Sequence, residues 1–206
     1  LGTALTTGTD NVAIGEASGD ALTSGADNTL VGDNAGGALT TGGNNVAVGS
    51  GALLVATTAA DNTAVGTLAL TANSSGTDNT AVGYAAGDAV TTGSDNTFVG
   101  DNAGGATTDG DQNTAVGSSA LLTNSTGEYT VAIGYEALKV QTTASNNVAV
   151  GWQAGVATTT GASNTFIGKY SGAANTTGDS NVALGANSLD ANTTADNNVA
   201  VGYAAL

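Results

Sequence analysis

Carboxylates are the side chains of this sequence that could take part in chemistry, because the chain has 17 Asp and Glu residues but no His and no Cys. The commonest general base and the thiol nucleophile are therefore missing. Two carboxylates, Asp33 and Asp101, follow a glycine at places where other parts of the chain carry Ser50, Tyr84 or Trp152. Such scatter is typical of a solvated face, so we predict that the protein is not an enzyme.

Nine of the carboxylates recur at two neighbouring places of a 17-residue interval. They are Asp10, Asp27, Asp61, Asp78, Asp95, Asp111, Glu128, Asp179 and Asp196. If the intervals stack as strands do, about 4.8 Å apart, each pair of like charges costs about 1 kcal/mol even in water. Hard cations would relieve this repulsion and use nearby carbonyl groups as further ligands. A solvated acidic edge explains the same pattern, so no cofactor is predicted and calcium is the alternative.

Threonines recur close to the acidic places, mostly as adjacent pairs such as Thr91–Thr92. Threonine columns on a flat solenoid can order water, which makes ice binding a further alternative. Adjacent residues of an extended chain point to opposite faces, so these pairs do not form a two-column hydroxyl array. Four Asn-x-Ser/Thr sites, at Asn73, Asn124, Asn175 and Asn192, would matter only where a glycosylation system is present.

All of these places belong to one repeated unit, of which Asp78–Ser94 is an example. Twelve copies follow one another without insertion, beginning at Asp10, Asp27, Asn44, Asp61, Asp78, Asp95, Gln112, Tyr129, Asn146, Ser163, Ser180 and Asn197. A fixed period predicts a solenoid, in which each unit buries its apolar face against its neighbours. We call each unit a coil and number its positions 1 to 17. The chain, 1–206, is predicted to be one repeat domain from a longer fibre, with Leu1–Thr9 as the tail of an earlier coil.

The local sequence predicts an all-β parallel β-solenoid of twelve 17-residue coils. Positions 3–5 are β-branched or aliphatic and lie between Asn and Gly, which indicates a short strand. Positions 9–14 predict a second strand, and Thr-Thr-Gly-x-Asp-Asn, as in Thr91–Asn96, indicates a corner. Stacking at about 4.8 Å gives a rod on the order of 55–60 Å long. Gly, Thr and Asn are too frequent for a helix.

Position 2 is Asn in eleven of the twelve coils, and Thr130 is the exception. Identical amides stacked at the strand spacing can bond from coil to coil. The predicted ladder consists of Asn11, Asn28, Asn45, Asn62, Asn79, Asn96, Asn113, Asn147, Asn164, Asn181 and Asn198. Position 6 is Gly in every coil, which indicates a positive φ or a close backbone approach. Both columns are interpreted as scaffolding.

One outer stripe of the rod must be apolar, whichever way the strand faces. If positions 3 and 5 point inward, position 4 points outward, and it carries no polar side chain in any coil. If position 4 points inward, the aliphatic position 5 lies outside. We assign the self-association stripe to position 4: Ala13, Leu30, Ala47, Ala64, Ala81, Phe98, Ala115, Ala132, Ala149, Phe166, Ala183 and Ala200. An exposed apolar stripe marks an interaction surface; a neighbouring segment of the parent chain is the other way to cover it.

A longer period of four coils is superimposed on the short one, dividing the chain into three blocks of 68 residues. Position 10 runs Gly, Gly, Leu, Leu in each block, and the bulky residues at position 4, Leu30, Phe98 and Phe166, recur at the same interval. Duplication of a four-coil block explains this pattern. Packing is the other explanation, if glycine pairs leave room that a Leu or Phe fills.

The charge balance excludes several classes of partner. Lys139 and Lys169 are the only cations, and the net charge is −15. A protein that cannot neutralise phosphates is a poor ligand for nucleic acid and for anionic membranes. No apolar run approaches the 18 or so residues of a membrane span, so no membrane insertion is expected.

The motif Asn-Val-Ala-Ile/Val-Gly, as in Asn11–Gly15 and Asn147–Gly151, resembles the head repeats of trimeric autotransporter adhesins, the YadA-like class. The longer phrase in Asn181–Leu206 is similar to repeats of phage tail-fibre and related surface-fibre proteins. The resemblance implies a left-handed parallel β-roll in which three chains associate side by side.

The predicted function is that of a structural fibre or filament segment at a cell or virion surface, projecting or mediating attachment. The expected partner is a second copy, in a homotrimer or an end-to-end filament, and an extracellular location follows. An adhesin with a surface receptor or glycan is the functional alternative. A receptor site should break the repeat, and such departures occur at Tyr129–Thr130, Trp152, Lys169 and Tyr170. The acidic and threonine columns leave a calcium-binding or an ice-binding extracellular β-solenoid open as well.

Overall fold

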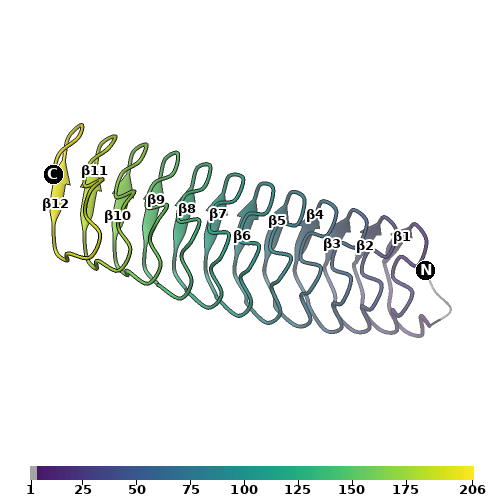
Figure 1. The fold of residues 1–206 in the computed structure, drawn as a ribbon. Coiled ribbons are helices and arrows are strands. Elements are labelled where there is room, and N and C mark those ends of the chain that lie inside the picture. Colours follow the sequence, from purple (N-terminus) through teal and green to yellow (C-terminus); the bar gives the residue numbers. More distant parts are fainter. Residues whose placement is uncertain (1–3) are drawn as a thin grey trace.

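The computed structural model describes residues 4–206 and shows an all-β solenoid, with no helix in that range (Figure 1). Its twelve strands each have three residues and form one parallel sheet in sequence order. They are β1 Val12–Ile14, β2 Thr29–Val31, β3 Val46–Val48, β4 Thr63–Val65, β5 Thr80–Val82, β6 Thr97–Val99, β7 Thr114–Val116, β8 Val131–Ile133, β9 Val148–Val150, β10 Thr165–Ile167, β11 Val182–Leu184 and β12 Val199–Val201. The predicted fold class is confirmed; its hand stays a prediction.

Each strand pairs with the next at a constant offset of one coil. Val46 lies beside Thr63, and Thr63 lies beside Thr80, so residues at the same position form straight columns. The coils stack into a rod whose two ends hold the N- and C-terminal segments (Figure 1). Each surface of the rod is therefore made of such columns, one for each outward position of the coil.

The second strand expected at positions 9–14 is absent from the coils that the structure describes, because the backbone of this half of the coil is not extended. Positions 8 and 10 have positive φ in every coil; in the fifth coil the values are 49° at Ala85 and 59° at Gly87. Local turns close there instead, as where the amide of Val90 donates to the carbonyl of Gly87. Bonds to the next coil still form, for example from Gly87 to Ala103. One strand and a chain of turns therefore replace the predicted two strands.

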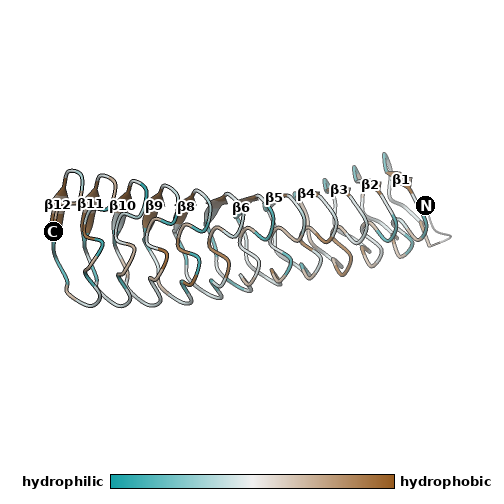
Figure 2. Ribbon diagram, turned by 45° about the horizontal axis from the view of Figure 1, so that its top comes forward, coloured by the Kyte–Doolittle hydropathy of each residue, from teal (hydrophilic) through white to brown (hydrophobic). Residues whose placement is uncertain are grey.

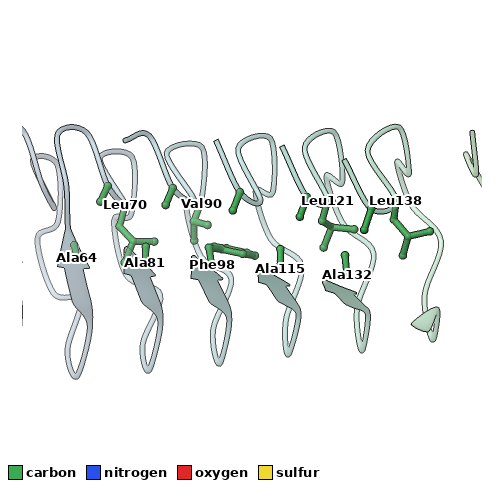
Figure 3. Close-up of a cluster of buried hydrophobic side chains, with 14 of the residues drawn as sticks. Ala64, Leu70, Ala81, Val90, Phe98, Ala115, Leu121, Ala132 and Leu138 are labelled. Atoms are coloured by element: carbon green, nitrogen blue, oxygen red, sulfur yellow. The ribbon is translucent and has the colours of Figure 1, made fainter. Parts of the chain in front are cut away.

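Position 4 points into the coil, so the self-association stripe assigned to that column is wrong. Ala47, Ala64 and Phe98 are 0% exposed, and the column belongs to the core along the rod. Positions 9, 10 and 13 supply the opposite wall of that core, for example Ala103 at position 9. Leu70 at position 10 and Val90 at position 13 are seen in Figure 3. The second orientation considered for the strand is therefore the observed one, in which position 4 points inward and positions 3 and 5 point outward.

The four-coil period matches the packing of this core. Phe98 fills the space above two glycines at position 10, and a Cβ built on Gly87 or Gly104 would lie 2.7 Å or 2.4 Å from its ring. Coils with Ala at position 4 and Leu at position 10, such as those of Leu70 and Leu121, fill the same volume from the other wall (Figure 3). Packing of the core thus explains the four-coil alternation without invoking a duplication.

The asparagine ladder forms as predicted. In the middle of the rod the amide of Asn96 donates to Oδ1 of Asn79, and Nδ2 of Asn96 donates to the carbonyl of Gly110 in its own coil. The side chain thus ties the start of a coil to its end and to its neighbour. These amides are 0–1% exposed from Asn28 to Asn181, where bonds cannot be replaced by water.

The glycine at position 6 meets both expected requirements. Gly100 has φ of 137°, and a Cβ on it would lie 2.7 Å from the backbone of Gly117 in the next coil. L-residues do not adopt this φ readily, whereas glycine does because it has no Cβ, and backbone atoms of a stacked coil cannot move aside.

Candidate interaction surfaces

The outward side chains of the strands form the first candidate surface, which we call the strand face. It consists of positions 3 and 5, which alternate with the buried position 4 in strands β2 to β12, as in β3, β6 and β9. Position 5 supplies Ile14, Val31, Val48, Val65, Val82, Val99, Val116, Ile133, Val150, Ile167, Leu184 and Val201. Position 3 supplies Val12, Thr29, Val46, Thr63, Thr80, Thr97, Thr114, Val131, Val148, Thr165, Val182 and Val199.

The strand face is apolar and carries no charge along the described rod. All 24 side chains are Val, Ile, Leu or Thr, and the strands are among the hydrophobic segments in Figure 2. Val82, Ile133 and Ile167 are 37–38% exposed although both neighbouring coils flank them. A contiguous exposed apolar surface of this kind is a candidate interaction site.

Some carboxylates of the acidic columns at positions 17 and 1 accept hydrogen bonds from the backbone of the preceding coil. Oδ1 of Asp111 accepts the amide hydrogen of Ser94, one coil before, and Asp179 and Asp196 repeat this pattern. Nearby, hydroxyl groups of Thr92 and Thr91 hold the pKa of Asp109 below its usual value. Within residues 4–206 no three acidic side chains converge as metal ligands would.

Threonine columns 14 and 15 differ in exposure, as their opposite directions require. At position 14 the hydroxyl group donates to the carbonyl of position 14 in the next coil, as Thr23 does to Thr40. Position 15, for example Thr92, is exposed in every described coil. A single exposed column results, interrupted by Asp109, to which the hydroxyl group of Thr92 donates, and not a two-column array.

An aromatic cluster on coils eight to ten is the second candidate surface; we define it as Tyr135, Trp152, Lys169 and Tyr170. Tyr135, Trp152 and Lys169 occupy position 7, directly after the invariant glycine, and Tyr170 follows at position 8. Position 8 amides donate to position 7 carbonyls one coil earlier, as Tyr170 does to Trp152 at 3.0 Å. This bond holds successive position 7 side chains in one column.

The rings of the cluster contact one another. Tyr135 and Trp152 are stacked, with centroids 6.1 Å apart and planes 13° from parallel, and Tyr170 meets Trp152 edge-on at 4.7 Å. The ammonium group of Lys169 lies 5.2 Å from the Trp152 ring and 5.3 Å from that of Tyr170, within cation–π range. Tyr135 is 46% exposed and Trp152 40%.

A polar group adjoins the rings. Glu136 accepts a hydrogen bond of 2.6 Å from Lys139 through Oε1, and Gln153 donates to its Oε2. The hydrogen bond from Lys139, followed by that from Gln153, lowers the pKa of Glu136. The same contact with Glu136 raises the pKa of Lys139. The carboxylate is thereby held in a fixed orientation beside the aromatic surface.

Of the departures from the repeat, the structure brings together Trp152, Lys169 and Tyr170 but not Tyr129–Thr130. Tyr129 lies at position 1, in another column, and Thr130 is buried. Sequence reasoning missed Tyr135, although its place at position 7, one coil before Trp152, was a usable signal. Three of the four Asn-x-Ser/Thr sites, Asn73, Asn124 and Asn175, are 0% exposed and cannot accept a glycan in the folded rod.

Both candidate surfaces are open: no pocket is found in the part of the chain that the structure describes. The same residues include no helix that could cross a membrane. No family model, curated protein or solved structure matches this chain.

Proposed function

We propose that the protein is a structural fibre or filament segment at a cell or virion surface, and that its rods associate side by side as a homotrimer through the strand face. The observation that carries the proposal is the uncharged apolar surface of positions 3 and 5. The resemblance of Asn147–Gly151 to YadA-like head repeats supports the trimer and the extracellular location.

The size of the strand face favours more than two rods. Twelve coils about 4.8 Å apart and three residues across give roughly 600 Å² per rod. A face-to-face pair would bury about 1,200 Å² in total, the lower limit for a stable specific interface. Three rods directing their strand faces to a common axis also shield columns that flank the face.

Electrostatics decides how tightly the rods associate. Each chain carries a net charge of −15, so neighbouring rods repel one another although the strand face itself is neutral. Salt at about 0.15 M screens charges beyond roughly 8 Å. We therefore expect association to strengthen as salt is raised, the reverse of an assembly held by salt bridges.

Light scattering on a size-exclusion column tests the proposal. We expect a mass near three times that of the 19.4 kDa chain. The double variant Val82→Lys/Val116→Lys places cations on the strand face and should give monomers. Thr92→Lys/Thr126→Lys introduces the same charges in the same coils at exposed position 15 and should leave the mass unchanged. A monomeric wild-type chain at 0.5 M salt would contradict lateral association.

Three other results, from light scattering or from observation of ice growth, would favour a different function. Open-ended polymers would favour an end-to-end filament, and their loss with a calcium chelator would favour a metal at the acidic columns. A monomer that reshapes growing ice crystals would favour ice binding, for which the exposed column at position 15 and the six threonines of position 3 are the relevant groups.

A further inference from the structure

The departures from the repeat are concentrated in three of the twelve coils. The only Trp of the chain, both of its Lys residues and two of its five Tyr residues fall between Tyr135 and Tyr170. A scaffold role does not need them, since position 7 carries Ser, Thr, Ala, Asp or Glu in seven other coils and a single Tyr, at Tyr84 and Tyr203, in the remaining two. We propose that the aromatic cluster binds an oligosaccharide, whose pyranose rings pack against the exposed parts of Trp152 and Tyr135.

The ring geometry suits the flat face of a sugar. Tyr135 and Trp152 lie only 13° from parallel on consecutive coils, and both are exposed by 40% or more. The face of an aromatic ring is electronegative and attracts the weakly positive C–H groups of one pyranose face. The coil spacing of about 4.8 Å is close to the length of one sugar unit, so neighbouring units of a sugar chain lying along the rod reach successive coils.

The polar groups beside the rings suit the hydroxyl groups of a sugar. Both oxygens of Glu136 are held by Lys139 and Gln153, yet a carboxylate has about four acceptor sites, so free ones are left. The ammonium group of Lys169 forms no salt bridge within the described residues. An oriented acceptor and a free cation next to an apolar platform match a ligand with one apolar face and polar edges.

Other ligands fit this surface less well. Bases of nucleic acids also stack on aromatic side chains, but their binding needs a basic groove, and this chain carries −15. Protein hot spots insert into well-packed pockets, whereas the described surface has none. Sugars bind open platforms of this kind.

The free cation predicts a preference among glycans. Lys169 and Lys139 are the only cations on an acidic rod, and Lys139 is engaged by Glu136. A uronate carboxylate near Lys169 would therefore gain a charge-assisted contact that a neutral sugar lacks. We expect tetragalacturonate to bind more tightly than cellotetraose.

Trp152 makes the test specific, because it is the only indole in the chain and its fluorescence reports this surface alone. Titration with tetragalacturonate, cellotetraose and chitotetraose should shift the emission in a saturable way for at least one of them. Tyr135→Ala should weaken binding by about fivefold, as expected for one lost ring contact. Lys169→Ala should weaken tetragalacturonate alone.

Tyr84→Ala is the matched control, since Tyr84 occupies position 7 and is 54% exposed but lies outside the cluster; it should bind as wild type does. Trp152→Ala removes the fluorescent indole, so its binding is measured by retention of the protein on a gel that carries the same glycans. This variant should no longer be retained. No response to any of the three probes, or equal weakening by Tyr84→Ala, would overturn the proposal. So would a change in rod mass with Trp152→Ala, because it would place the cluster in the self-association interface.

Discussion

The Nε2 atom of Gln141 donates a hydrogen bond of 3.3 Å to the hydroxyl oxygen of Thr130, the residue that interrupts the asparagine ladder. Gln141 also donates to the carbonyl of Ala144 at 2.9 Å and accepts from Nδ2 of Asn147 at 2.8 Å. An asparagine at position 130 would make the equivalent bonds, as Asn96 does to Gly110. The longer amide of Gln141 therefore replaces the missing rung from the other wall of the coil.

Removing this replacement should destabilise the middle of the rod. Gln141→Ala leaves the buried carbonyl of Ala144 without its donor, and we expect a loss of about 2–4 kcal/mol in the free energy of unfolding. Thr130→Asn alone should also destabilise, because Gln141 fills the site. The double variant restores the repeat pattern, with alanine at position 13 as at Ala56, and should recover most of the stability in urea unfolding. Additive single effects would contradict the replacement.

The packing of Phe98 against Gly87 and Gly104 predicts a second pair of substitutions in which one compensates for the other. Gly104→Leu should destabilise strongly, because its Cβ alone would lie 2.4 Å from the Phe98 ring. The backbone is not the obstacle, since Leu121 occupies the same position at φ of 53°. Phe98→Ala should cost about 3–5 kcal/mol. Phe98→Ala/Gly104→Leu should unfold at a higher urea concentration than either single variant. A double variant less stable than both single variants would refute the packing explanation.

The glycine column at position 6 should not tolerate a methyl group. Gly100→Ala combines an unfavourable φ of 137° with a contact of 2.7 Å to backbone, and a loss of about 3 kcal/mol or more is expected. Gly105→Ala is the control, because the nearest atom to its Cβ would be Cδ1 of the flexible Leu122 side chain at 3.2 Å, with no other atom closer than 3.4 Å, and Ala173 occupies this position elsewhere. Thermal unfolding followed by circular dichroism compares the two; equal midpoints would count against the close approach.

Acid should weaken the structure around Glu136. Its pKa is lowered in the folded chain, chiefly by Lys139, so the folded state binds fewer protons than the unfolded chain. The stability it contributes is present above its ordinary pKa and is lost as the pH falls through the lowered value. Because the group is partly exposed, the effect is small. Comparing thermal midpoints of wild type and Glu136→Gln from pH 7 to 3 should show the difference shrinking with acid; a constant difference would contradict this.

The period, the asparagine ladder and the glycine column could be derived from sequence, because each coil meets only its neighbours and identical residues must then stack. The single β-strand per coil could not be foreseen. Positions 8 and 10 hold Ala85, Leu70 or Tyr170 in a left-handed conformation that such residues rarely choose by themselves. Bonds to the neighbouring coils impose it.

Only the tertiary structure decided which side chains of each strand point into the core and which point to solvent. Positions 3, 4 and 5 are all compatible with either side, since Val46, Ala47 and Val48 carry no polar group to forbid burial. Core volume settles the matter: the small Ala47 and the large Phe98 both fit the interior only because the opposite wall holds Leu53 or glycine at the matching height. Likewise, Trp152 and Tyr135 are 17 residues apart in the chain, and only the stacking of coils turns them into one surface. The sequence alone determined which residues form columns; the closure of the coil around its core decided which columns meet water.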